Sequence, residues 1–185
     1  MAEYYFLSQL PSLDGISGNV PLPITEERFL ELCHRYLGKK ALDEINKLTL
    51  IPSREYEKSS SRLIEAWNEG ERNLRLALGK VRAEKMKKTY YLGNEYLSTQ
   101  LVKVAQTAVE MESPLEAENF LNLYRLEFLE TLRPMDTFSE DSVFYYGLKL
   151  KLLTRERQFQ TEIGEKAYKN IYNSIMNGDR LEAIQ

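Results

Sequence analysis

Residues 61–81 of the chain read SRLIEAWNEGERNLRLALGKV, and this stretch decides the fold class. Apolar or small residues recur in it at intervals of three and four positions. They are Leu63, Trp67, Gly70, Leu74, Leu78 (with Ala77) and Val81. Such spacing places side chains on one face of an α-helix. We therefore expect a long helix near residues 60–90 whose apolar face packs on other helices of the same chain.

The rest of the chain from Thr25 onward repeats this spacing and never alternates strictly, which predicts an all-α helical bundle of about six helices. Short helices are expected from Thr25 to Gly38 and from Lys40 to Leu48, and long ones near 95–111, 114–133 and 139–177. Ser113, Pro114 and Glu116 give the clearest start, because Ser suits the N-cap, Pro the first position and Glu the third.

Other segments carry weaker signals. Residues 4–10 fit either a short helix or an extended piece. Residues 11–24 are rich in Pro, Gly and Ser, which predicts a flexible or loop segment within a single domain spanning 1–185. Glycines mark further candidate features of the helices. Gly93 and Asn94 suit a helix end, Gly164 a kink and Gly178 the last helix end.

Composition narrows the class of protein. The chain has 185 residues, 43% of them apolar and 29% charged, and a formal net charge of -3, which is typical of a soluble globular domain. It lacks the run of about 20 apolar residues that a membrane-spanning helix needs. The N-terminal residues lack the pattern of a secretory signal, so we expect a cytoplasmic location.

Few residues could support catalysis or metal binding. Cys33 and His34 are the only Cys and His, so neither a disulfide nor a Cys/His zinc site can form within the chain. Gly79 and Lys80 lack the second Gly and the Ser or Thr of a phosphate-binding loop. Glu31 and His34 give one Glu-x-x-His pair, whereas a di-metal bundle uses two. We expect no catalytic, cofactor or metal site, and no enzyme activity.

Positive charge gathers in one segment. Residues 1–92 carry 15 Lys and Arg against 13 Asp and Glu, and the remainder carries 10 against 15. The excess lies at Lys80, Arg82, Lys85, Lys87 and Lys88, directly before Tyr90 and Tyr91. Such a segment suits an acidic protein, nucleic acid or anionic lipid. Because the sequence pI is about 5.5, we expect a protein partner rather than nucleic acid.

A second candidate partner-binding surface lies in the last long helix. Tyrosine combines a large apolar body with a polar tip and is frequent at interfaces. The candidate residues combine it with lysine, and we expect an exposed side there. They are Tyr145, Tyr146, Lys149 and Lys151.

Three segments together resemble a bacterial family encoded alongside the subunits of V/A-type ATPases (ATP synthases). They are residues 4–13 (YYFLSQLPSL), residues 113–121 (SPLEAENFL) and residues 145–153 (YYGLKLKLL) with Arg155-Glu156-Arg157. The resemblance implies a protein like the central-stalk connector of these complexes. That connector is the helical subunit between the rotor axle and the membrane ring, in a machine that transports protons or sodium ions.

This resemblance implies a non-catalytic subunit or an assembly factor. Its partners would be the rotor axle and the membrane ring, and it would lie at the cytoplasmic face of the membrane without a cofactor. The alternative is a free-standing α-helical adaptor or regulator that binds a protein or nucleic acid.

Overall fold

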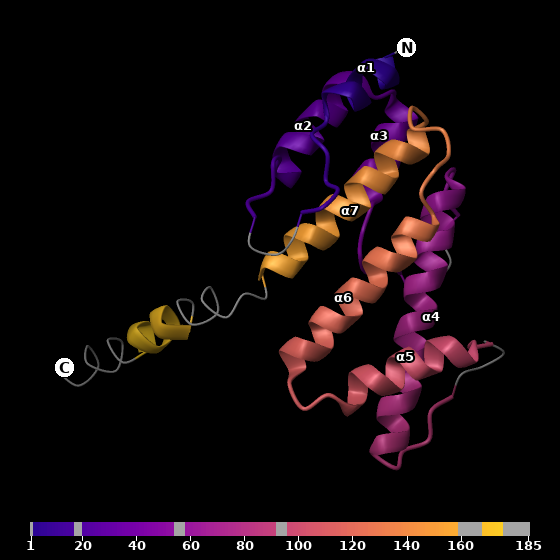
Figure 1. The fold of residues 1–185 in the computed structure, drawn as a ribbon, viewed down its shortest axis with the longest axis vertical. Helices are drawn as coiled ribbons and strands as arrows, with labels where there is room; N and C mark the ends of the chain where they lie inside the picture. The colour runs from indigo at the N-terminus through magenta and orange to yellow at the C-terminus, as the bar shows by residue number, and fades with distance from the viewer. Residues whose placement is uncertain (1, 17–19, 54–57, 92–95, 159–167, 176–185) are drawn as a thin grey trace, which may run out of the picture.

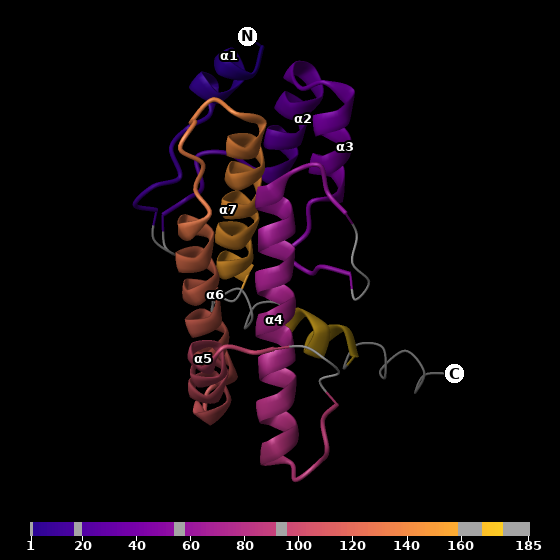
Figure 2. The same cartoon turned by 90° about the vertical axis from the view of Figure 1, so that its right-hand side faces the viewer.

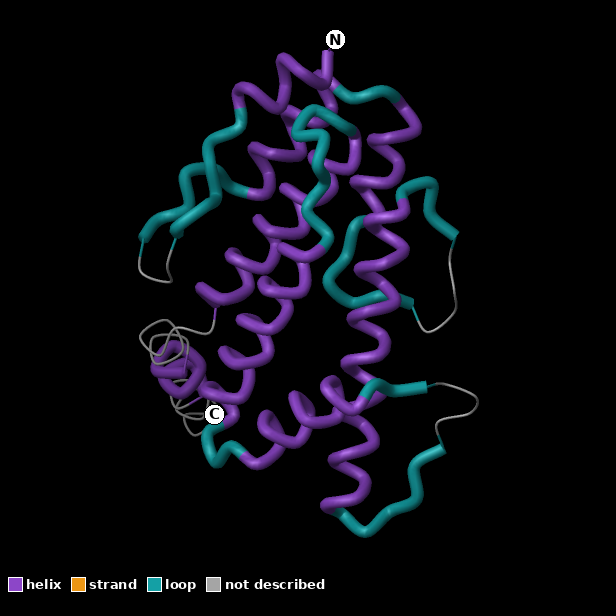
Figure 3. Tube along the Cα trace, turned by 45° about the vertical axis from the view of Figure 1, so that its right-hand side comes forward, coloured by secondary structure: helices purple, strands orange, loops and turns teal. Residues whose placement is uncertain are grey.

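The computed structural model describes residues 2–16, 20–53, 58–91, 96–158 and 168–175. These residues form helices joined by loops, and none of them lies in a β-strand (Figure 3). The all-α prediction is confirmed. The helices are α1 (Ala2–Gln9), α2 (Glu26–Tyr36), α3 (Lys39–Lys47), α4 (Arg62–Lys85), α5 (Thr99–Glu110), α6 (Pro114–Thr131) and α7 (Glu140–Gln158). Residues 168–175 are also helical.

Helix α7 is the centre of the bundle. It contacts α1, α2, α3, α4 and α6, and in Figure 1 it lies between α2 and α6. Val143, Leu148, Leu150 and Leu152 on this helix are fully buried. A helix that is enclosed on every side needs apolar residues around its whole circumference rather than along one stripe. Accordingly, ten of its 19 residues are buried.

Helix α4 takes part in two hydrophobic cores. Its first half contributes Leu63, Ile64 and Trp67 to the core around α7. Its second half contributes Leu74 and Val81 to a smaller core with α5 and the start of α6. With 24 residues, α4 is about 36 Å long, and Figure 2 shows it running along the molecule. The predicted apolar face is therefore confirmed, and it packs on helices of its own chain.

The helix ends follow local capping interactions. Ser113 Oγ accepts a hydrogen bond from the Glu116 amide at 3.3 Å, so α6 begins where the sequence predicts. Helix α5 begins at Thr99 rather than near 95, because Ser98 Oγ accepts from the Leu101 amide at 3.2 Å. Helix α2 is likewise capped by Thr25.

Helix α4 ends at Lys85, five residues before the predicted end. Lys87 adopts a left-handed conformation with φ 55°. Its amide donates to the Glu84 carbonyl at 3.0 Å, and the Lys88 amide donates to the Ala83 carbonyl at 2.9 Å. These two bonds form the Schellman arrangement that closes a helix.

The two ends of the chain and the glycines carry the remaining predictions about helices. Residues 4–9 are helical, which resolves the alternative left open for the first segment. The described residues between 11 and 24 form no helix, as predicted for a loop. The segments 92–95, 159–167 and 176–185 lie outside the described residues, and with them Gly93, Asn94, Gly164, Gly178 and the predicted continuity of the last helix from 158 to 177.

Candidate functional site

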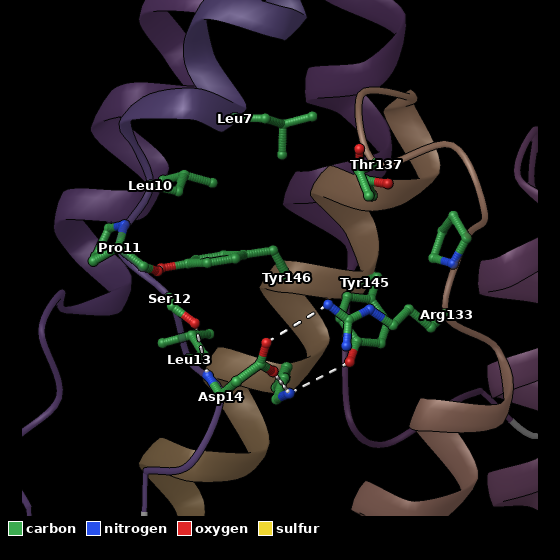
Figure 4. Close-up of a pocket in the computed structure, with 13 residues that line it drawn as sticks. Leu7, Leu10, Pro11, Ser12, Leu13, Asp14, Arg133, Thr137, Tyr145 and Tyr146 are labelled. Atoms are coloured by element: carbon green, nitrogen blue, oxygen red, sulfur yellow. Dashed lines mark hydrogen bonds and ion pairs between the residues drawn. The ribbon is translucent and has the colours of Figure 1, made fainter.

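A pocket of about 190 Å³ opens where α1 and the loop after it meet the end of α6 and one side of α7 (Figure 4). Its upper wall is apolar, with Leu7, Leu10 and Pro11. Its floor is polar. The side chains there are Asp14 from the loop, Arg133 from the segment after α6, and Tyr145, Tyr146 and Lys149 from α7.

Lys149 is the centre of a polar network on this floor. Its Nζ donates to Asp14 Oδ1 and to Glu130 Oε1, each at 2.6 Å. Tyr145 Oη also donates to Glu130 Oε1 at 2.6 Å. Arg133 lies 3.6 Å from Asp14 and 3.7 Å from Glu130. Two cations thus face two carboxylates, and the floor of the pocket is electrically neutral.

The surroundings fix the ionisation state of this network. The hydrogen bond from Lys149 lowers the pKa of Asp14. Partial burial opposes ionisation of Glu130, but hydrogen bonds from Lys149 and Tyr145 outweigh it and lower the pKa of that carboxyl. Burial and the bond to Glu130 raise the pKa of Tyr145 to about 12. The pKa of Lys149 is raised, because its bonds to the two carboxylates outweigh the effect of burial.

The network fastens residues 11–14 to the bundle. Tyr146 Oη donates to the Pro11 carbonyl at 2.9 Å, Lys149 holds Asp14, and Leu13 between them is buried. At neutral pH, Lys149 is an ammonium and Tyr145 a phenol, and both have partners within the chain. These side chains therefore brace the loop.

The expected exposed side from Tyr145 to Lys151 was wrong. Tyr145 and Lys149 are each only 8% exposed, and Tyr146 is half-buried. Lys151, also half-buried, donates to Glu26 Oε2 at 3.1 Å and links α7 to α2. The physical reason is the central position of α7, because five neighbouring helices cover its surface. Lysine and tyrosine serve here as internal hydrogen-bond donors.

The basic segment at the end of α4 is exposed, but its cations differ in their surroundings. Lys80 lies 3.9 Å from Glu84, and Lys85 Nζ donates to the Val109 carbonyl at 2.9 Å. Arg82, Lys87 and Lys88 are exposed, and their side chains make no ion pair or hydrogen bond with another described residue.

The two tyrosines after the basic segment have different positions. Tyr90 folds back on α4, and its hydroxyl oxygen lies 2.6 Å from where a side-chain carbon at Gly79 would be. Gly79 therefore provides the seat for the Tyr90 ring. Tyr91 is 91% exposed. Met86, between the cations, and Tyr96 are also exposed, and no sequence motif singled out these two residues.

A buried ion pair joins α4 to α6. Arg125 Nε donates to Glu71 Oε2 at 2.9 Å, and the two side chains are 6% and 1% exposed. Asn122 Oδ1 accepts from Arg125 at 3.1 Å. This pair lies inside the bundle and has a structural role.

The residues considered for metal or thiol chemistry lie apart. Cys33 is fully buried, and burial raises the pKa of its thiol to about 12, whereas His34 is exposed. Within the described residues, no group of three or more His, Cys, Asp or Glu side chains is placed to hold a metal ion. In the same part of the chain, no helix combines the length and apolar character needed to cross a membrane.

Comparisons with known proteins give one match. Residues 90–179, just under half of the chain, match a family described as "Protein of unknown function (DUF2764)". The matched region contains α5, α6 and α7, and it excludes α1 to α4. Neither a curated protein nor a solved structure matches the chain.

Proposed function

We propose that the protein is a non-catalytic subunit or assembly factor of a bacterial V/A-type rotary ATPase, with a role like that of the central-stalk connector. The observation that carries the proposal is the continuity of α4. One helix of 24 residues joins two hydrophobic cores without a break. A connector that transmits torque or holds an axle to a ring needs this kind of stiffness, because contacts at one core are then rigidly coupled to the other.

Two further features support the proposal. The residues named by the resemblance lie in α1 and the loop after it, in the capped start of α6 and in α7, so they frame the bundle. The charged groups at the centre of the pocket are paired with one another, which is compatible with bracing. In this proposal the rotor axle and the membrane ring are the partners. The protein would then be peripheral at the cytoplasmic face of the membrane.

The test is a pull-down of the tagged full chain from native membranes, followed by mass spectrometry and an ATPase assay of the recovered material. Enrichment of the catalytic and axle subunits is the expected result. A tagged unrelated helical protein of similar net charge controls for non-specific capture. Recovery of no ATPase subunit from membranes that demonstrably contain the complex would overturn the proposal and favour the free-standing adaptor.

A further inference from the structure

We infer that the end of α4 docks on an acidic protein surface that has an apolar centre. The docking residues are Arg82, Met86, Lys87, Lys88 and Tyr91, which we call the α4 tip. This inference rests on the proposed function in one respect, namely that the protein acts by binding other proteins. It adds the chemistry of the partner and the residues that recognise it.

The α4 tip projects from the molecule. In Figures 1 and 2 the C-terminal end of α4 extends past α5. Arg82 and Met86 are four residues apart, so they share one side of the helix end. The next two residues, Lys87 and Lys88, lie in the turn that closes α4, and both are exposed. A partner can therefore approach this end without displacing another described element.

The α4 tip is also held in shape before a partner arrives. The two Schellman hydrogen bonds fix the turn, and the contact of Tyr90 with Gly79 anchors the segment that follows. Lys85 is held to the end of α5 through Val109. A surface that is already ordered loses less conformational entropy on binding.

The composition of the α4 tip matches that of a protein interface. Tyr, Met and Arg are the residue types enriched where proteins meet, with apolar anchors at the centre and charges around them. Met86 is 59% and Tyr91 91% exposed, which is a large apolar area left in water. Three neighbouring cations have no partner among the described residues, so the complementary surface carries carboxylates.

A protein partner fits better than nucleic acid or a membrane. Proteins that bind duplex DNA tightly contact about six to ten phosphates, and membrane-binding basic clusters contain about four to eight Lys and Arg. The α4 tip offers three available cations, because Lys80 and Lys85 already make contacts within the chain. Three cations around two apolar anchors suit a compact acidic patch.

The test combines cross-linking with charge reversal. A benzophenone amino acid replaces Tyr91 in the full chain, the cells are irradiated, and the cross-linked peptides are identified. The same cells express Lys87→Glu/Lys88→Glu. The control variant is Lys39→Glu/Lys40→Glu, which makes an equal charge change at two exposed lysines at the start of α3. Melting temperatures of all variants are measured first, and Lys87→Gly checks that the turn tolerates loss of this lysine.

The expected result is a cross-link to a protein peptide flanked by Asp and Glu, lost about tenfold in Lys87→Glu/Lys88→Glu and unchanged in the control. Increasing salt should weaken capture of the same protein. A cross-link to lipid or nucleic acid, or equal capture by the charge-reversed variant, would overturn the inference. Capture of ATPase subunits through another surface would overturn it and leave the proposed function standing. Specific capture of an acidic protein outside the ATPase would do the reverse.

Discussion

Lys149 shows how a single buried cation can hold a loop. Its ammonium group is bound by Asp14 and Glu130, whose side chains remain about half exposed, while Lys149 itself is nearly inaccessible. Lys149→Met keeps the volume but leaves two carboxylates without their main partner. We expect the free energy of unfolding to fall by about 1–3 kcal/mol in urea titrations. The matched control, Lys151→Met on the same helix, should cost less, because its pair with Glu26 is more exposed.

The same network predicts a pH dependence. The pKa values of Asp14 and Glu130 are lowered in the folded protein, so their stabilising effect is present above the unfolded values of about 4. That effect is lost as pH falls through the folded values. The stability difference between wild type and Lys149→Met should therefore shrink when urea midpoints are measured below pH 4 rather than at neutral pH. A constant difference across this range would contradict the assignment.

Gly70 is a position where the absence of a side chain matters. An added carbon would lie 2.3 Å from Phe128 Cε1, and the Phe128 ring stacks on Trp67. Alanine normally favours a helix over glycine by about 1 kcal/mol, but this overlap should reverse the sign. We expect Gly70→Ala to destabilise the protein by about 1–3 kcal/mol in thermal or urea unfolding.

Gly79→Ala is the matched control on the same helix. Its obstacle is the hydroxyl end of Tyr90, which lies in a partly exposed segment and can swing aside. The change should be near neutral. An equal loss at Gly70 and Gly79 would show that helix distortion rather than the Phe128 contact decides the result.

At the scale of the helices, caps define where each element begins, and Ser61 does more than cap. Its hydroxyl accepts from the Ile64 amide at 3.2 Å and donates to Asp141 Oδ1 at 2.6 Å, which ties α4 to the start of α7. Ser61→Ala should cost about 2 kcal/mol of unfolding free energy. Ser113→Ala removes only a cap and should cost about 1 kcal/mol. Equal costs in urea titrations would mean that the bond to Asp141 contributes nothing.

The caps also explain which helix boundaries the sequence predicts well. Ser113-Pro114 and Thr25 are local signals, and the helices begin beside them. The end of α4 was predicted too late, because Lys87 occupies a conformation that usually calls for glycine. The residue type therefore gave no sign of a stop, and the surrounding turn imposes it.

At the scale of the whole molecule, the two cores share α4, so they should unfold together. The single Trp residue, Trp67, lies in the core around α7 and reports on it by fluorescence. Leu74→Ala opens a cavity in the other core and should cost about 2–5 kcal/mol. We expect this substitution to shift the Trp67 fluorescence transition and the circular dichroism transition equally. A shift in the dichroism alone would contradict the predicted single domain.

The sequence by itself determined the helices and the face that α4 buries. Both follow from local spacing, because apolar residues three and four apart share a side of any helix. It also located the basic segment, whose exposure follows from the cost of burying charge. Neither inference needs knowledge of distant residues.

Only the tertiary structure decided which tyrosines and lysines are internal. Asp14 and Lys149 are 135 residues apart, and no local pattern links them. The motifs at Tyr145–Lys151 and Lys80–Tyr91 look alike in sequence, yet one is enclosed and the other projects. The difference is the number of helices packed around each. Packing is a property of the whole chain, whereas composition and periodicity are properties of a segment.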